Sequence, residues 1–196
     1  MLHALRRAWN KYLASIPKSV AVDSIPPSQW NASENLPGVP KAQRKAFLDL
    51  LYIVHSHLSP EDSKTLVSAG AKHLTRGDEI DTALHEALIG DNDNGDDGRP
   101  PHGFIACDWK GVEEVQWQAD VLRRVHALSD SWTAPSRDLD TVLGDLGMWL
   151  RQRQLHLFSF STGDNIVAFA VQEAQSPSVR KNLSKLKIRF SVAGEA

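Results

Sequence analysis

The side chains best suited to chemistry in this sequence are carboxylates that surround two tryptophans near the middle of the chain. Residues 78–120 contain 12 acidic residues against 2 basic ones, a segment charge of −10, whereas the 196-residue chain has a net charge of −2. A local negative field attracts cations and basic proteins and repels nucleic acid. The segment therefore predicts an interaction with a positively charged partner and none with nucleic acid.

Aromatic residues ringed by acids have the composition of a protein-binding surface, in which the rings supply affinity and the charges steer association. If either indole belongs instead to the core, its part of the surface is lost. The residues predicted to bind the partner are the acids of one loop, the acids that flank the next helix start, and both tryptophans: Asp91, Asp93, Asp96, Asp97, Asp108, Trp109, Glu113, Glu114 and Trp117.

The same carboxylates could instead hold a metal ion. Asp108 and Glu114, together with Asp96 and His102, would supply the ligands and the acid and base of a metal-assisted hydrolase. We keep this hydrolase as the alternative function, with its metal unspecified. The structural interpretation of the same residues is that Asp108 caps the following helix and Glu114 pairs with a neighbouring base.

The acidic loop lacks the register of an EF-hand. Counted from Asp91, the sixth position should be glycine and is Asp96, and the twelfth should be glutamate and is His102. A looser oxygen site for a hard cation stays open. A solvated loop is the simpler interpretation, because flexible carboxylates are not a preorganised cage.

No signature of nucleophilic or nucleotide-dependent catalysis occurs in the sequence, which has no GxSxG, P-loop, GxGxxG or HExxH motif. His55 and His57 are two positions apart, so on a helix they point in different directions and do not share a zinc ion. His126 falls on the apolar arc of its helix and is predicted to be a hydrogen-bonded core residue. We therefore predict no cofactor and favour a non-enzymatic function.

The composition predicts a cytoplasmic protein. Cys107 is the single cysteine, so no internal disulfide can form, and its apolar surroundings predict a buried, unreactive thiol. The chain has neither a run of 18 apolar residues nor a secretory signal, which predicts no membrane insertion. The bases of residues 180–189 could contact phosphates, but a solvated edge strand explains them without nucleic acid.

The chain divides into three parts. Residues 1–16 predict an amphipathic helix that docks on its own domain or, alternatively, on a membrane surface. Residues 17–40 contain 5 prolines and predict an extended connector. Residues 41–196 predict a single globular domain.

Hydrophobic periodicity predicts an α+β fold for this domain. Helices are expected over 41–58, 60–72, 78–89, 111–128 and 138–153. Strands are expected over 103–108, 155–160, 165–171 and 185–192, with a further helical turn within 177–183. The expected architecture is a helical N-terminal layer packed with a largely antiparallel sheet of about four strands and two covering helices.

One helix carries polar residues where apolar ones are expected. On a wheel of 111–128, Glu114 and Gln118 fall within the apolar arc, one turn apart. A polar side chain buried there must have a partner, because unpaired burial is costly. The two residues are therefore either satisfied internally or line a cleft.

The segment from Gly103 to Val171 resembles an uncharacterised family of small bacterial proteins that carry an Asp-Trp-Lys corner followed by a Glu…Trp-Gln helix. The matching residues are Asp108, Trp109, Lys110, Glu113, Glu114, Trp117 and Gln118. The resemblance implies no activity. Small acidic α+β proteins are also common among bacterial immunity proteins, an analogy of type that makes a toxin-neutralising binding protein our leading hypothesis.

Overall fold

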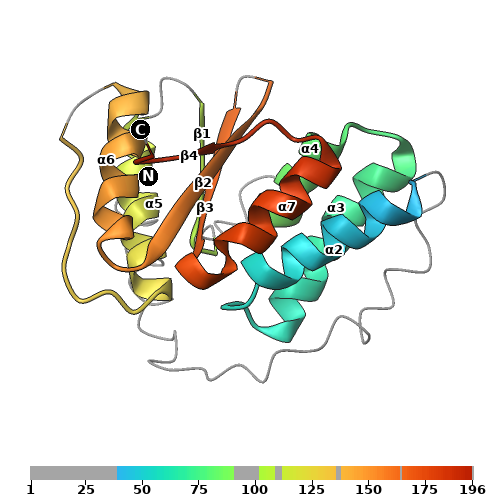
Figure 1. Cartoon of the computed structure of the whole chain (residues 1–196), viewed down its shortest axis with the longest axis horizontal. Coiled ribbons are helices and arrows are strands. Elements are labelled where there is room, and N and C mark those ends of the chain that lie inside the picture. The colour runs from blue at the N-terminus through green and yellow to red at the C-terminus, as the bar shows by residue number, and fades with distance from the viewer. Residues whose placement is uncertain (1–38, 91–101, 109–111, 136–137, 164, 196) are drawn as a thin grey trace, which may run out of the picture.

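The computed structural model describes residues 39–90, 102–108, 112–135, 138–163 and 165–195. These residues form three layers, with a sheet between two groups of helices (Figure 1). The predicted helix over 1–16 and nearly all of the predicted connector lie outside the described residues. The predicted α+β class, with helices on both sides of an antiparallel sheet of four strands, is confirmed.

The sheet has the strand order β1-β3-β2-β4, and all three pairings are antiparallel. β2 and β3 form the predicted hairpin, in which Leu155 lies opposite Gln172 and Thr162 opposite Asn165. β1 pairs along the other edge of β3. The bounds of the strands are Phe104–Asp108 for β1, Leu155–Thr162 for β2, Asn165–Gln172 for β3 and Ser191–Val192 for β4.

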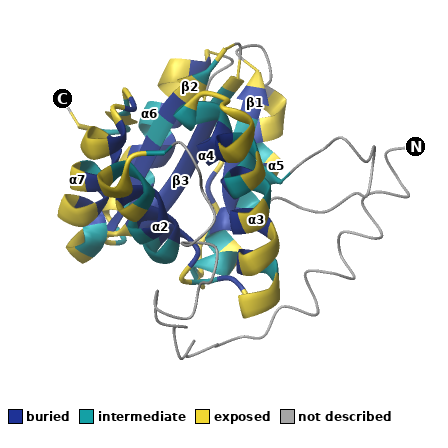
Figure 2. Cartoon of the chain, turned by 90° about the vertical axis from the view of Figure 1, so that its right-hand side faces the viewer, coloured by how far each residue is buried: buried dark blue, intermediate teal, exposed yellow. Residues whose placement is uncertain are grey.

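Alternate side chains of the strands point to opposite faces of the sheet and build two separate cores. Phe158 and Phe169 stack with their ring centroids 5.7 Å apart in one core. Leu157 and Ala168, each one position away, belong to the other core. β3 is buried in both directions, as its unbroken apolar run predicts for a central strand. Figure 2 shows this buried sheet in dark blue between the helices.

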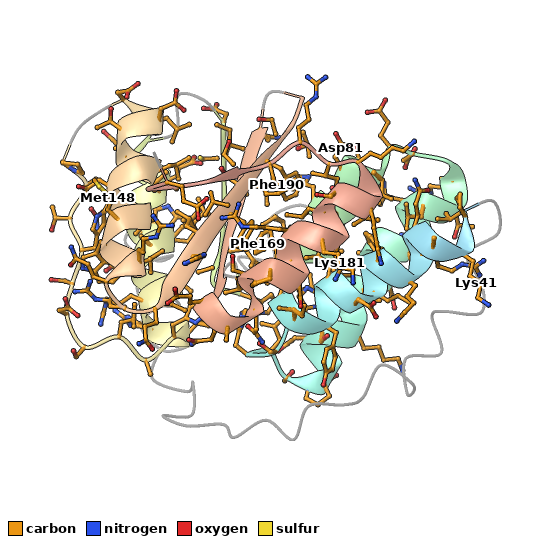
Figure 3. All side chains as sticks on the ribbon, viewed as in Figure 1. Lys41, Asp81, Met148, Phe169, Lys181 and Phe190 are labelled. Atoms are coloured by element: carbon orange, nitrogen blue, oxygen red, sulfur yellow. The ribbon has the colours of Figure 1, made fainter. Side chains whose placement is uncertain are left out.

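Four helices cover the Phe158 face: α2 (Lys41–Val54), α3 (Pro60–Arg76), α4 (Ile80–Ile89) and α7 (Ser176–Leu186). Two helices cover the other face: α5 (Val112–Val125) and α6 (Leu139–Arg151). In Figure 3, Lys41 of α2 and Met148 of α6 mark opposite sides of the molecule. No helix of the described ranges is long and apolar enough to cross a membrane.

Capping residues explain where several helices begin and end. The hydroxyl of Ser59 accepts a hydrogen bond from the amide of Asp62 at 3.1 Å, and Pro60 occupies the first turn of α3. Gly77, with φ of 89°, ends α3 in the left-handed conformation that glycine adopts without strain. The side chain of Asp138 caps α6, because it accepts a hydrogen bond from the amide of Thr141.

Several sequence-based boundaries are wrong, among them the end of the helix predicted over 60–72, which extends to Arg76. The helix predicted over 41–58 ends at Val54, and residues 55–58 form a turn. The strand predicted over 185–192 is largely absent, because α7 extends to Leu186 and only Ser191–Val192 pairs with β2. Val179, Leu183 and Leu186 bury one helical face of α7, and this burial outweighs the alternation that follows it in the sequence.

Candidate functional site

The predicted binding residues fall partly inside and partly outside the described residues. Asp91, Asp93, Asp96, Asp97 and Trp109 lie outside them. Asp108, Glu113, Glu114 and Trp117 are described and come from the junction of β1 with α5. We call these last four residues the acidic α5 surface.

The carboxylates of the acidic α5 surface gather where β1 ends and α5 begins. Asp108 is the last residue of β1, and Glu113 and Glu114 lie in the first turn of α5; all three are exposed. The positive end of the helix dipole favours acids at this position. Among the described residues, neither Glu113 nor Glu114 takes part in an ion pair.

Two carboxylates of the acidic α5 surface influence the buried thiol of Cys107. Burial, the largest cause, and the negative charges of Glu114 and Asp108 together raise the pKa of Cys107 to about 11. A thiol with such a pKa stays protonated at neutral pH and is a poor nucleophile. The prediction of a buried, free cysteine is confirmed.

The indole of Trp117 joins this surface and is not part of the core. Its side chain is 42% exposed, and it stands three and four positions after Glu114 and Glu113, on the same side of α5. Single exposed apolar residues are ordinary, but tryptophan is the residue type that dominates binding energy at protein interfaces. One aromatic ring thus lies beside a group of carboxylates on one helix.

Of the two polar residues predicted to lie on the apolar arc, Gln118 is buried and Glu114 is exposed. Gln118 is only 4% exposed, and its amide is satisfied internally: Oε1 accepts from the Ala106 amide at 2.7 Å, and Nε2 donates to the Ala106 carbonyl at 2.8 Å. Glu114 is exposed, so its placement in the apolar arc is wrong. The core covers α5 from Val115 onward, whereas Glu113 and Glu114, just before it, lie in solvent.

The Gln118 amide occupies an edge of the sheet. Antiparallel strands direct the amide and carbonyl of alternate residues to the same side, and those of Ala106 point away from β3. Gln118 therefore pairs with β1 in the way that a further strand would. This contact anchors α5, and with it the acidic α5 surface, to the sheet.

A second glutamine anchors α5 to the segment that leads to α6. Nε2 of Gln116 donates to the Trp132 carbonyl at 3.0 Å, and its Oε1 accepts from the Ala134 amide at 2.7 Å. The indole of Trp132 is buried and donates to Asp145 of α6 at 2.8 Å. A helical wheel places Gln116 opposite the apolar arc of α5, so neither of its contacts follows from the sequence pattern.

The ligands of the alternative hydrolase do not all come together. His102 precedes β1 and Asp108 ends it, so about 20 Å of extended chain separates them. Asp96 lies outside the described residues. Across the described ranges, no group of three or more histidine, cysteine, aspartate or glutamate residues is arranged to hold a metal ion.

Comparison with known proteins finds one family. The model of a domain of unknown function, DUF6630, matches residues 43–193, from the first turn of α2 to just beyond β4. No curated protein and no solved structure matches the chain. The family match agrees with the expected membership of an uncharacterised family.

Proposed function

The chain belongs to the DUF6630 family of domains of unknown function, and we propose that it is a non-enzymatic protein that binds a basic protein through the acidic α5 surface. Within this class, a bacterial immunity or inhibitor protein that neutralises a basic toxin is the member we favour. The observation that carries the proposal is the grouping of three exposed carboxylates with the exposed indole of Trp117 at one end of α5.

The structure of α5 supports a preorganised binding surface. A side chain that is already held in place loses little conformational entropy on binding, so more of the interaction free energy appears as affinity. The amides of Gln116 and Gln118 fix α5 to the loop before α6 and to β1. The carboxylates and the indole are therefore carried by a helix that is fixed on two sides.

Charge and aromatic contacts should contribute differently to binding. Glu113 and Glu114 lie at the rim of the surface in solvent, where charges chiefly raise the association rate and make it depend on salt. Trp117 can lose its remaining exposed area to a partner, and tryptophan anchors mainly slow dissociation. The two kinds of substitution should therefore have separable kinetic effects.

Partner capture with a charge-matched control tests the proposal. Wild-type protein, the variant Glu113→Lys/Glu114→Lys and the control Asp140→Lys/Glu173→Lys are immobilised and exposed to a lysate of the source cells. Asp140 and Glu173 are exposed acids on other elements, so both variants change the net charge equally. The expected result is a basic protein captured by the wild type and the control but not by the α5 variant.

Kinetics with the captured protein complete the test. Charge reversal at Glu113 and Glu114 should lower its association rate at least about tenfold at low salt, since steering changes such rates by ~10 to 10³. Trp117→Ala should accelerate dissociation roughly thirtyfold, as expected for an interface anchor worth ~2 kcal/mol. Equal capture by the wild type and the α5 variant would refute the proposed surface.

A further inference from the structure

Three histidines and one phenylalanine from separate parts of the chain form a series of ring contacts. His55 and His57 come from the turn after α2, and His126 follows the last residue of α5. The ring of Phe104, at the start of β1, lies 5.8 Å from that of His55 and 5.5 Å from that of His57, and the His57 and His126 rings are 5.7 Å apart. We call this group the histidine seam.

The seam joins α2, α5 and β1 at one point. His57 donates from Nε2 to the carbonyl of His102 at 2.5 Å, which ties the turn after α2 to the residue that leads into β1. A carbonyl only accepts, so the proton of neutral His57 resides on Nε2. Gly103 lies in the left-handed region, and a Cβ added to it would meet the side chain of Val125 at 3.2 Å. The end of α5 therefore packs directly against the start of β1.

The seam is built for neutral imidazole rings. His55 is 3% exposed, and no atom of the described residues hydrogen-bonds to the buried Nε2 of His55 or of His126. Nδ1 of His55 lies 3.2 Å from the Ser63 hydroxyl of α3. The ring also faces the backbone of Ala87, an interaction that favours the protonated ring but is outweighed by burial. An imidazolium ring has two N–H donors and a positive charge, both of which need partners when buried.

Within the part of the chain that the structure describes, no ion pair joins a carboxylate to a ring of the histidine seam. On the seam itself the titratable neighbours are other histidines, including His102. On α4, Glu86 pairs with His85 at 3.4 Å. On α5, Arg123 pairs with Asp120 at 3.7 Å, and Arg123 and Arg124 add positive charge to the last turn beside His126.

The titration of the rings follows from this environment. Burial, the largest cause, and the charges of neighbouring histidines together lower the pKa of His55 to about 3, of His57 to about 4 and of His126 to about 3. Backbone hydrogen bonds to Ala87 and His102 act in the opposite direction on the pKa of His55 and His57 but are outweighed. Stability contributed by these neutral rings is complete above the unfolded pKa of ~6.5 and is lost as the pH falls from there towards the folded values.

We propose that the histidine seam is an acid-sensitive joint, at which protonation of the rings releases the ends of α2 and α5 from β1 before the rest of the fold opens. This inference goes beyond the proposed function, because it needs no partner and concerns the end of α5 remote from Glu113 and Glu114. For one histidine whose pKa changes from the folded value given above to ~6.5 when its ring is released, the equilibrium constant for opening is roughly thirtyfold larger at pH 5.0 than at pH 7.5.

Hydrogen exchange of the full chain tests the joint. Opening constants at pH 7.5 and 5.0, corrected for intrinsic exchange rates, are compared between peptides covering residues 50–58 and 119–128 and the β2–β3 hairpin. Acid should raise opening at the seam at least thirtyfold more than in the hairpin. Equal increases would overturn the proposal, because they would mean that acid acts only through global unfolding.

Ring titration and variants complete the test. In the native protein, the NMR signals of His55, His57 and His126 should not titrate near pH 6.5, and titration of these rings there without any opening would also overturn the joint. His126→Leu removes one of the three titrating rings, so the increase in the opening constant from pH 7.5 to pH 5.0 should be about thirtyfold smaller than in the wild type. The matched control His73→Gln alters a histidine of α3 that pairs with Asp78 at 2.8 Å, and it should leave the acid effect unchanged. If His126→Leu does not fold, the wild-type exchange and titration data decide.

Discussion

Replacing Gln118 with glutamate should convert the anchor between α5 and β1 into a pH-dependent one. The amide of Gln118 both accepts from and donates to Ala106, and it is almost completely buried. A carboxylate keeps the acceptor but loses the donor, and it places a negative charge against the Ala106 carbonyl. A protonated carboxyl restores both hydrogen bonds, because it has one O–H donor and one free acceptor oxygen.

The size of the effect follows from the two hydrogen bonds. A buried polar group left unpaired costs ~1–3 kcal/mol, so loss of the donor together with the buried charge should destabilise Gln118→Glu by roughly 3 kcal/mol at neutral pH. At ~1.4 kcal/mol for each pKa unit, this corresponds to a rise in the pKa of the new carboxyl from ~4.3 to about 6.5. The destabilisation should be complete above that folded pKa and disappear as the pH falls towards ~4.3.

Urea unfolding at a series of pH values, followed by tryptophan fluorescence, measures this difference. The free energy of unfolding of Gln118→Glu is compared with that of the wild type at each pH, so that the histidine titration, common to both, cancels. Gln172→Glu serves as the control, because Gln172 is exposed at the end of β3. A deficit for Gln118→Glu that stays constant from pH 7 to pH 4.5, or no deficit at pH 7, would refute the proposed role of the amide.

A pair of glycine substitutions and a labelling experiment probe the α5–α6 side of the sheet. Gly147→Ala should destabilise the fold by ~1–3 kcal/mol, because its Cβ would lie 2.4 Å from the Ala193 carbonyl oxygen. The Cβ of Gly144→Ala, in the same helix, would meet nothing within 4 Å, so this control should raise stability by up to ~1 kcal/mol. Opposite shifts of the two melting temperatures would confirm this, and equal shifts would contradict it. Maleimide should modify Cys107 slowly in the native state at pH 8 and rapidly in urea, since the thiol is buried and its pKa is raised to about 11; fast native labelling would show that the junction of β1 and α5 opens readily.

Several elements could be predicted because their signals are local. The Ser59-Pro60 pair begins α3, Asp138 caps α6, and the period-two pattern with a tight turn produces the β2–β3 hairpin. These signals act over a few neighbouring residues, within the range of capping and strand alternation. The helix and strand content of the core, and hence the α+β class, follows from them.

The region after β3 could not be predicted in the same way. Leu186, Ile188, Phe190 and Val192 alternate in the sequence as a strand would, yet Leu186 ends α7. Leu186 and Ile188 are nevertheless buried, and the intervening Lys187 is exposed, so the alternation correctly indicates which side chains face the core. The backbone conformation was decided by the packing of α7 against α2 and the sheet.

The sequence by itself determined the acidic character of the α5 start and the buried, single cysteine, because each depends on composition or on one element. Only the tertiary structure decided that Gln118 closes the edge of β1, that His55 and His57 contact Phe104, and that His126 contacts His57. Hydrogen bonds and pKa values depend on which atoms lie within a few ångströms, and residues 57 and 126 become neighbours only when α2, β1 and α5 pack together.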